Sequence, residues 1–287
     1  MEIAFVSGKG GTGKSSIASA FISLSENIMA IDCDVDAANM YLIFEPENQK
    51  ESNYVSGRFA VIDNDKCTSC DLCRSLCQFD AINIIDQKYI IDEISCDGCA
   101  LCYRECPEEA IKMIENDDSR IYLGDFAYGS IVYGRMSPGE ENSGKFISHI
   151  REIAREESRV KGIATTILDG PPGIGCPYIS TIIGVDKLVL ITEPSLSGIS
   201  DLERAVRVAK THVEKVYLII NKSDLNLEIT EKIKVYAKEN NIEIIGLLPF
   251  DRSFIDAMIA GRSIIDHSPE SESANIIRKA YDLVMNN

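Results

Sequence analysis

Eight of the ten cysteines form two short runs, and no other feature of the sequence constrains the fold as strongly. The runs are Cys67, Cys70, Cys73 and Cys77, then Cys96, Cys99, Cys102 and Cys106. Each run has the spacing C-x2-C-x2-C-x3-C, and the second repeats the first 29 residues later. The repeat extends beyond the cysteines, because eight of twenty aligned residues are identical and four of those are Leu, Ala or Ile. We therefore predict a small unit of two similar halves, with the shared Ala and Ile residues in its core.

This spacing is typical of chains that hold two 4Fe–4S clusters. Zinc is the weaker alternative, because structural zinc sites usually pair two C-x2-C units across a longer loop. In the crossed arrangement, the last cysteine of each run binds the cluster of the other run. We expect the first three cysteines of a run on a tight loop and the fourth at the start of a helix. The predicted ligands are Cys67, Cys70, Cys73 and Cys106 for cluster one, and Cys96, Cys99, Cys102 and Cys77 for cluster two.

The two runs differ after their last cysteine, where Pro107 follows Cys106 but Gln78 follows Cys77. Proline fixes the backbone and removes an N–H group, and glutamine does neither. We expect this difference to leave ligation intact and to make cluster two more exposed or differently tuned.

A second motif begins at residue 8. Residues 8–15 read Gly-Lys-Gly-Gly-Thr-Gly-Lys-Ser and satisfy the phosphate-loop pattern G-x4-G-K-[ST]. An apolar strand over residues 2–6 precedes the loop and a helix from about residue 14 follows it, as the motif requires. We expect backbone N–H groups to bind phosphate oxygens, Lys14 to reach the β- and γ-phosphates, and Ser15 to hold Mg²⁺. The full predicted contact set is Gly8, Gly10, Gly11, Thr12, Gly13, Lys14, Ser15 and Ser16.

Apolar runs that alternate with helical patterns indicate the fold. Strands are predicted over residues 28–31, 164–168, 187–192, 216–220 and 243–248, and helices over 198–211, 228–239, 252–259 and 270–285. The apolar spacing of the last helix indicates that it packs on the core. The alternation predicts an α/β fold with a doubly wound, mostly parallel sheet. A nucleotide is then expected at the carboxyl ends of its strands.

Acidic residues follow two of these strands. Asp32, Asp34 and Asp36 end or follow the strand at residues 28–31, and Asp169 follows the strand at 164–168. A single Asp in such a place is often only a turn or cap residue. Two strand-terminal acids beside a phosphate loop, however, are where Mg²⁺ and an attacking water need carboxylates. We therefore predict functional roles for acids at the ends of both strands.

The contacts to the base are indicated less specifically. The segment Asn221-Lys222-Ser223-Asp224 follows a strand and matches the N-K-x-D pattern that reads guanine, so GTP stays open as an alternative to ATP. Asn221 is predicted to contact the base. Pro249 and Phe250 follow the next strand and are predicted to pack on the other face of the base.

Lys9, early in the phosphate loop, resembles the deviant loop of the MinD, ParA and nitrogenase-reductase superfamily. The resemblance covers residues 1–45 and 120–287, and with the cysteine runs the chain looks like such an ATPase carrying an inserted two-cluster ferredoxin domain. It implies a Mg²⁺-dependent ATPase, slow and stimulated by a partner, that forms a homodimer or pairs with a paralogue. In this family Lys9 would reach the partner's nucleotide, Asp34 would orient the attacking water, and Asp169 would bind Mg²⁺ through water.

The expected domains are the ATPase at residues 1–53 and 117–287 and the inserted ferredoxin domain at 54–116, with 120–147 as the link. Cys176 lies seven residues after Asp169, where nitrogenase reductase has a cluster-binding cysteine. The stretch 139–150, which corresponds to the second cluster-binding cysteine of that protein, contains none. A transient cluster ligand and an ordinary thiol are equally open interpretations of Cys176, whereas Cys33 is expected in the core.

The charge of the chain limits its partners. Lys and Arg number 29 against 45 Asp and Glu, and the net charge of −16 disfavours binding to nucleic acid or to an anionic membrane. The sequence shows neither a signal peptide nor a membrane span, so a cytoplasmic location is expected. Residues 54–116 alone carry 12 acidic and 6 basic residues, which favours a basic docking partner.

Three functions fit these features. The preferred one is an ATPase that couples its nucleotide state to electron transfer through the two clusters, or to iron–sulfur or metallocofactor assembly with a partner protein. The second is an iron–sulfur carrier or scaffold in which Cys176 is the labile ligand. The third is a positioning ATPase like MinD or ParA, whose clusters are structural or sensory.

Overall fold

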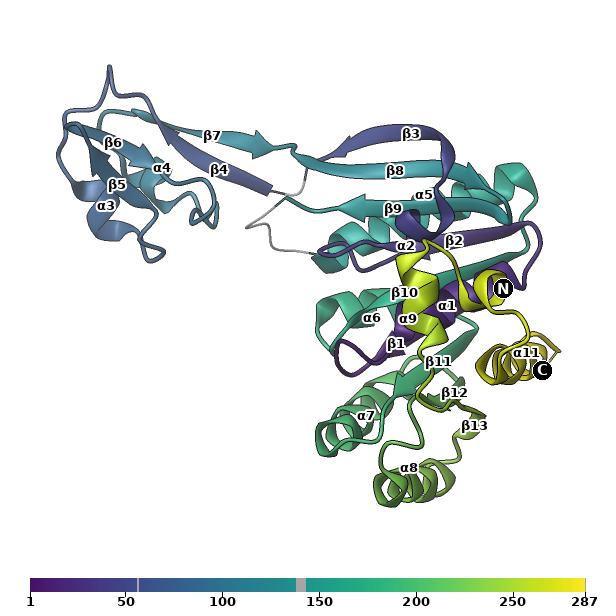
Figure 1. The fold of residues 1–287 in the computed structure, drawn as a ribbon. Helices are drawn as coiled ribbons and strands as arrows, with labels where there is room; N and C mark the ends of the chain where they lie inside the picture. Colours follow the sequence, from purple (N-terminus) through teal and green to yellow (C-terminus); the bar gives the residue numbers. More distant parts are fainter. Residues whose placement is uncertain (56, 138–142, 287) are drawn as a thin grey trace. The chain divides into compact units, whose positions relative to one another are not determined.

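A mostly parallel sheet organises the larger part of the chain. The computed structural model describes residues 1–55, 57–137 and 143–286. The strands of this sheet are β1 (Glu2–Ser7), β2 (Ile28–Asp32), β3 (Glu47–Tyr54), β8 (Ser119–Phe126), β9 (Gly129–Arg135), β10 (Thr165–Pro172), β11 (Lys187–Thr192), β12 (Lys215–Ile220) and β13 (Glu243–Leu247). Within the described residues their order is β13-β12-β11-β1-β10-β2-β9-β8-β3 (Figure 1). Each neighbouring pair from β13 to β9 is parallel.

Helices cover both faces of the sheet. They are α1 (Lys14–Ser23), α2 (Met40–Phe44), α5 (Ser143–Lys161), α6 (Cys176–Ile182), α7 (Leu196–Ala209), α8 (Leu227–Glu239), α9 (Ser253–Ile259), α10 (Ile264–His267) and α11 (Glu272–Asn286). Helices α1, α9, α10 and α11 pack together on one side, and α5 to α8 lie on the other (Figure 1). Strands β2 and β11 are buried along their whole length, as expected of strands covered on both faces. The predicted α/β fold with a mostly parallel sheet is therefore confirmed.

The boundaries of several elements differ from the prediction. Strand β10 continues through Asp169 to Pro172 rather than ending at residue 168. Helix α7 runs over 196–209 instead of 198–211, and a separate short helix, α10, precedes α11. The largest difference concerns residues 120–147, which were expected to link two domains. Most of β8, all of β9 and the first turns of α5 lie there.

Aromatic side chains join α2 to these neighbouring strands. The ring of Tyr133 on β9 stacks on Tyr41 of α2, with centroids 5.1 Å apart, and on Tyr122 of β8, with centroids 4.9 Å apart. The Tyr133 hydroxyl donates to Gln49 Oε1 on β3 at 2.8 Å. Phe44, at the other end of α2, packs against Phe126. Helix α2 is therefore fixed by rings on the strands beside it.

Internal contacts divide the chain into two compact units. The larger unit comprises Met1–Glu51, Ile121–Gly134 and Ser143–Asn287, and the smaller unit comprises Ser52–Arg120 and Arg135–Asn142. Strands β3, β8 and β9 each contain residues of both units. The identity of residues 54–116 as an inserted ferredoxin domain stays a prediction.

The smaller unit consists of short paired elements. Its elements are β4 (Gly57–Ile62), α3 (Leu72–Leu76), β5 (Ile82–Ile85), β6 (Lys88–Ile91), α4 (Leu101–Glu105) and β7 (Ile111–Asn116). Strand β4 pairs with β7 and β5 pairs with β6, both antiparallel. The shared residues Ala81 and Ala110 are 1% exposed and the shared Ile82 and Ile111 are also buried, as the repeat predicts. The second shared Ile pair was wrongly expected in the core, because Ile85 and Ile114 lie near the C-terminal ends of β5 and β7 and are 53% and 45% exposed.

The 29-residue repeat is also visible in the backbone. The residues before α3 and α4, Asp71 and Ala100, both adopt left-handed conformations, with φ of 66° and 62°. The residues after these helices, Cys77 and Cys106, are extended with the same ψ of 113°. The fourth cysteine of each run therefore follows a helix, and the expectation that it starts one was wrong. In the described part of the chain, no helix is long and apolar enough to cross a membrane.

Candidate functional site

The phosphate loop joins β1 to α1 and depends on a close contact with Asn221. Gly13, directly before α1, has a φ of 87°, a conformation that favours glycine. A Cβ atom on Gly13 would lie 2.4 Å from Asn221 Nδ2. The same amide donates to the Thr12 carbonyl oxygen at 2.8 Å. Asn221 thus holds the end of the loop in place and fills the space beside Gly13.

Lys14 and Asp169 form a buried ion pair beside this loop. Lys14 Nζ lies 2.6 Å from Asp169 Oδ1, and the side chains are 7% and 0% exposed. Lys14 Nζ also donates to Ser15 Oγ at 3.2 Å. The structure therefore brings together the three side chains predicted to bind phosphate and Mg²⁺. A phosphate group bound by Lys14 would leave the Asp169 carboxylate available to a cation.

Three buried polar atoms of this region have no hydrogen-bond partner. They are Thr12 Oγ1 in the loop, Asn39 Oδ1 after β2, and Asp169 Oδ2 on β10. Buried polar atoms are normally paired, so these three indicate a polar ligand. Loop N–H groups, a lysine, a hydroxyl and a carboxylate are the groups that phosphate and Mg²⁺ require. The residues present therefore fit a magnesium nucleotide.

Asp32 organises the segment that follows β2, and sequence reasoning assigned it no role. Its carboxylate accepts hydrogen bonds from the backbone N–H groups of Asp34, Asn39 and Met40 at 3.1, 2.9 and 3.0 Å. Burial, and then the nearby Asp169 carboxylate, hold the pKa of Asp32 well above its ordinary value. Its position at the end of a buried strand was the available signal. Asp32 acts as a positioning residue because it fixes the loop that carries Asp34.

Asp34 itself is half-buried and faces the same charges. Burial raises the pKa of the Asp34 carboxyl, the Lys14 ammonium opposes this rise, and Asp169 adds to it. Its sensitivity to both Lys14 and Asp169 means that Asp34 lies within electrostatic range of the phosphate loop. This position is compatible with the predicted role in orienting a water molecule.

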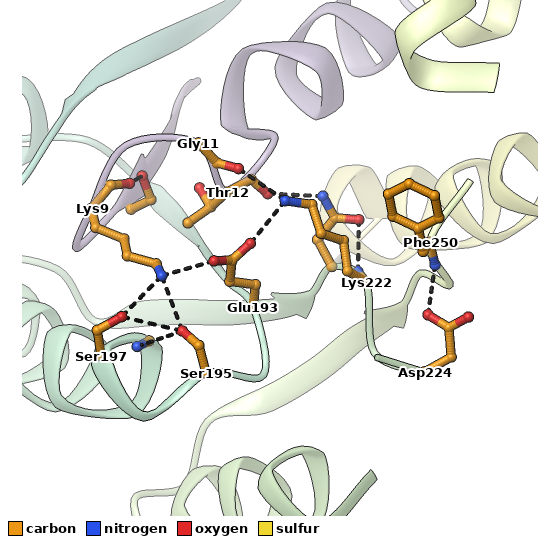
Figure 2. Close-up of polar contacts among 12 residues, drawn as sticks. Lys9, Gly11, Thr12, Glu193, Ser195, Ser197, Lys222, Asp224 and Phe250 are labelled. Carbon is orange, nitrogen blue, oxygen red and sulfur yellow. Dashed lines mark hydrogen bonds and ion pairs between the residues drawn. The ribbon is translucent and has the colours of Figure 1, made fainter. Parts of the chain in front are cut away.

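Lys9 is bound within its own chain (Figure 2). Its Nζ lies 2.7 Å from Glu193 Oε1 and donates to Ser195 Oγ and Ser197 Oγ, both at 3.0 Å. The other oxygen of Glu193 lies 2.8 Å from Lys222 Nζ, which also donates to the Gly11 carbonyl oxygen at 3.1 Å. Glu193 therefore bridges the two lysines on either side of the loop. No local motif marks Glu193, so this network was not predicted from the sequence.

A cavity beside the phosphate loop has the properties of a base site. It measures about 630 Å³ and is lined by Gly11, Gly13, Ser16, Asn221, Lys222, Phe250, Asp251, Phe254, Ile255 and Met258. Phe250 and Asn221 thus line the cavity as predicted contacts would, whereas Pro249 is not among its lining residues. Asp224 Oδ1 accepts the backbone N–H of Phe250 at 2.6 Å (Figure 2). One oxygen of the acid that would read guanine therefore accepts a hydrogen bond from the chain itself.

Comparison with known proteins agrees with this site. The CobQ/CobB/MinD/ParA nucleotide binding domain family matches residues 3–264. The chain belongs to this family. An uncharacterized protein of Methanocaldococcus jannaschii, MJ0578, is 35% identical over 98% of this chain and 95% of its own length.

Solved structures of the CobQ/CobB/MinD/ParA family share the fold. The septum site-determining protein MinD of Pyrococcus horikoshii, complexed with Mg-ADP, has a TM-score of 0.59 at 15% identity, covering 99% of this chain and 95% of that one. A ParA family ATPase from Chlorobium tepidum has a TM-score of 0.54 at 17% identity, covering 97% and 98%. At such identities these likenesses establish the fold. Membership of the family supports the prediction of a nucleotide-binding ATPase.

The family's nucleotide site does not account for the cysteine runs, which line two cavities in the smaller unit. Cys67, Cys70, Cys73 and Cys106 line cavity one. Cys77, Cys96, Cys99 and Cys102 line cavity two. In each cavity three cysteines come from one run and the fourth comes from the end of the other. This is the grouping that crossed ligation requires.

The cavities do not have the geometry of a site for a single ion. Within residues 1–55, 57–137 and 143–286, no group of three or more His, Cys, Asp or Glu side chains could hold one metal ion. In a 4Fe–4S cube each thiolate binds a different iron, so the four ligands stand farther apart than around one ion. Burial, and then the charge of Cys96, raises the pKa of Cys102 to about 11. The all-thiol donor set and its crossed grouping are compatible with a 4Fe–4S cluster.

The two remaining cysteines lie in different environments. Cys33 is completely buried, and burial raises its pKa to about 12, so the expectation of a core residue is confirmed. Cys176 is exposed and is the first residue of α6, after the loop that follows β10. A Cβ on Gly144 would lie 3.3 Å from Cys176 Cβ, so α5 packs closely against it. The stretch 139–150, in which no second cluster-binding cysteine was found, lies partly outside the described residues, at 139–142.

Proposed function

We propose that this chain is an ATPase whose nucleotide state controls two 4Fe–4S clusters, which transfer electrons or support metallocofactor assembly. The observation that carries the proposal is the pair of cavities, each lined by four cysteines in the crossed grouping. Both occur in the same chain as a family nucleotide site. In a chain that binds a nucleotide and two clusters, the nucleotide state can change the properties of the clusters.

The roles of the nucleotide site follow from its side chains. Lys14 binds the β- and γ-phosphates, and the N–H groups of residues 8–16 hold the remaining oxygens. Ser15 and Asp169 hold Mg²⁺, which neutralises charge on the phosphates. Asp34 orients the attacking water. Lys9 leaves Glu193 and reaches the nucleotide of a second copy or of a paralogue, as the superfamily resemblance implies.

Electron transfer is the favoured use of the clusters. Eight cysteines hold two cubes in fixed places, and Cys102 lies within electrostatic range of Cys73 in the other cavity. Fixed, neighbouring clusters conduct electrons, whereas a carrier must release its cargo. ATP hydrolysis is not a redox reaction, so the nucleotide cannot accept the electrons. We therefore expect the redox partner to be a separate protein.

The proposal is tested on chain purified without oxygen. We expect about eight irons and eight sulfides per chain, with an electron paramagnetic resonance signal of reduced 4Fe–4S clusters. Mg-ATP should shift the reduction potential or change the rate at which a partner is reduced. Zinc in place of iron, or a potential and rate both indifferent to ATP, would contradict the proposal.

An iron–sulfur carrier is the second candidate, and the exposure of Cys176 favours it. In this case the chain should bind iron and sulfide beyond the eight atoms of each held by the cavities, and should pass the excess to an apo-acceptor. The Cys176→Ala variant should lose that transfer while it keeps both cavity clusters. Equal transfer by the variant and the wild type would exclude this candidate.

A positioning ATPase is the third candidate, and the family fold favours it. It requires surface binding or filament formation that depends on ATP and leaves the clusters in one redox state. Sedimentation with and without Mg-ATP tests for assembly, and the cluster spectra recorded on the same samples show any redox change. Assembly without a redox change would support this candidate over electron transfer.

A further inference from the structure

The 29-residue repeat allows the rims of the two cysteine cavities to be compared position by position. Cavity one is lined by Thr68, Asp71, Leu72 and Glu108, and the same repeat positions in cavity two are Asp97, Ala100, Leu101 and Phe79. The backbones around α3 and α4 match closely. The two rims therefore differ in their side chains and not in their framework.

The rim of cavity one is polar. Asp71 accepts hydrogen bonds from Arg74 Nε at 2.6 Å and from the Tyr89 hydroxyl at 2.8 Å. Glu108 is exposed beside it. These charged groups are solvated or paired within the chain, so this rim needs no partner to satisfy it.

The rim of cavity two is more apolar at two of these four positions, whereas Asp97 takes the position of Thr68 and a leucine lies on both rims. Phe79 takes the repeat position of Glu108, and Ala100 takes that of Asp71. Phe79 is 44% exposed and Leu101 is 37% exposed. Cys99, a predicted cluster ligand, is exposed between the lining residues of the same cavity. Apolar side chains grouped on the surface beside a functional cavity indicate a contact with another molecule.

Acidic residues surround this apolar centre. Residues 76–105 carry six acidic and two basic side chains, so this part of the smaller unit is negative overall, and Asp97 lines cavity two itself. Asp80, Asp97 and Glu105 are all exposed. A cluster held by four thiolates adds roughly −2 in its oxidised form. A partner with an apolar contact ringed by lysine or arginine complements such a face, and a nucleic acid or another acidic surface does not.

We propose that the face centred on Phe79 and Leu101 is the docking surface for a basic electron-transfer protein. The inference rests on the proposed function, because it requires a cluster in cavity two. One electron leaves the reduced cluster, which is oxidised by one electron, and reduces the partner's centre by one electron, with no proton or bond exchanged. The electron then leaves the chain from the cluster in cavity two, which receives it from the cluster in cavity one.

The test measures binding without electron transfer. The probe is zinc-substituted cytochrome c, a redox-inert basic protein, titrated by fluorescence against the anaerobic holoprotein at low salt. Phe79→Glu adds a negative charge but removes the apolar ring, and Leu101→Ser removes the second contact. Each should weaken binding about tenfold, which is the loss expected for a central interface residue. Leu72→Ser, at the matching repeat position with 39% exposure, should change binding less than twofold.

The possible results separate docking from the proposed function. Stronger binding by Phe79→Glu would show that charge alone attracts the probe, and unchanged binding by both variants would also overturn the docking face. If Leu72→Ser weakens binding of the probe as much as Leu101→Ser does, the two rims contribute equally, and the choice of cavity two is overturned. Sedimentation identifies a second copy of this chain as the occupant if Leu101→Ser abolishes self-association but leaves probe binding unchanged. Iron and sulfide are measured on the same samples. Wild-type chain without iron would contradict the proposed function, whereas a variant that keeps its iron and loses binding has lost only the docking contact.

Discussion

The nucleotide site and the cysteine cavities differ in how far the protein itself satisfies their polar groups. At the nucleotide site Lys14 pairs with Asp169, and Glu193 bridges Lys9 and Lys222, while Thr12 Oγ1, Asn39 Oδ1 and Asp169 Oδ2 are left for a ligand. The cavity thiols, which all lie in the described part of the chain, have no ion pairs of this kind and are weak partners for one another. Cys106 Sγ accepts a hydrogen bond from the Ala110 N–H group at 3.4 Å.

The hydrophobic support of the two regions differs in the same direction. The sheet of the larger unit is packed by a continuous core that includes Phe5, Phe21 and Tyr217. In the smaller unit seven buried side chains form the core, and six of the cavity cysteines pack against it. Units with so small a core usually need a metal or disulfides for stability. The comparison indicates that the nucleotide site is held by the fold of the larger unit, whereas ligand binding in the cysteine cavities would help to stabilise the fold of the smaller unit.

The largest expected effect comes from removing the clusters that we propose for the cysteine cavities. Chelation of iron under anaerobic conditions should unfold the smaller unit, because metal-binding free energy there is folding free energy. The larger unit should keep its structure, because ion pairs and a large core hold it. Hydrogen exchange measures both: amides of residues 57–116 should lose their protection, and those of β1, β10 and β11 should keep it. If the smaller unit keeps its protection after chelation, it does not depend on the clusters for folding, and the contrast with the larger unit is wrong.

Removing Lys14 should affect catalysis much more than folding. Lys14→Met is expected to lower ATP hydrolysis at least about 100-fold, because the γ-phosphate loses its cation. The iron content should not change, because both cavities lie in the smaller unit. The matched control, Lys210→Met, removes a lysine that donates to the Asn240 carbonyl oxygen at 2.7 Å and is not among the lining residues of the base cavity, and it should retain most of the activity. Loss of iron in Lys14→Met would show that the two sites depend on each other for folding.

Replacing Phe250 should have a moderate effect confined to nucleotide binding. Phe250→Ala removes the ring that lines the base cavity and should weaken ATP binding about tenfold, the usual loss for a stacking contact. Pro249→Ala is the control, because Pro249 is not among the lining residues of that cavity. Asp224→Asn should not change the preference between ATP and GTP, since Asp224 is bonded to the Phe250 N–H group. Equilibrium binding of the two nucleotides measures all three variants.

The smallest expected effect concerns an ion pair at the edge of the larger unit. Burial alone would raise the pKa of Glu2, but hydrogen bonds from Arg155 and Arg151 outweigh it and lower the pKa below 4.5. Arg151 Nη2 lies 2.6 Å from Glu2 Oε2. Glu2→Gln should therefore cost about 1–3 kcal/mol at pH 7.

The pH dependence of that effect has a definite sign. A carboxyl with a lowered pKa stabilises the fold above its unfolded pKa, and the stabilisation is lost as the pH falls through the folded pKa. The difference between Glu2→Gln and the wild type should therefore shrink below pH 4.5. Urea unfolding of the larger unit at several pH values measures it. A difference that grows on acidification would contradict the assigned ion pair.

The sequence predicted the parts of the fold that local pattern determines. The phosphate loop, its strand and helix, and the parallel strands were found because spacing and apolar runs are local signals. Strands β8 and β9 were missed because glycines made residues 120–147 resemble a linker. A Cβ on Gly129 would lie 2.0 Å from the Ile28 carbonyl oxygen, so this glycine permits close strand pairing. That reason is tertiary and is not visible in a single sequence.

The candidate site shows the same division. Lys14, Ser15 and Asp169 were predicted from motifs and meet as expected. Glu193 was missed, because its contacts with Lys9 and Lys222 join segments far apart in the chain. Asn221 was assigned to the base, and its amide also holds the phosphate loop at Thr12. Motifs therefore indicated which residues matter, and the structure showed which neighbours they use.

The three stacked tyrosines beside α2 give the molecule an optical property. The chain contains no tryptophan and 11 tyrosines, so the aromatic part of its near-ultraviolet circular dichroism comes mainly from tyrosine rings. Tyr41, Tyr133 and Tyr122 are coupled at centroid distances of about 5 Å. Tyr41 belongs to the helix that begins directly after Asn39, one of the residues held by Asp32. Any shift of α2 when a nucleotide binds would change the overlap of these rings, so the protein carries its own label-free reporter of that event.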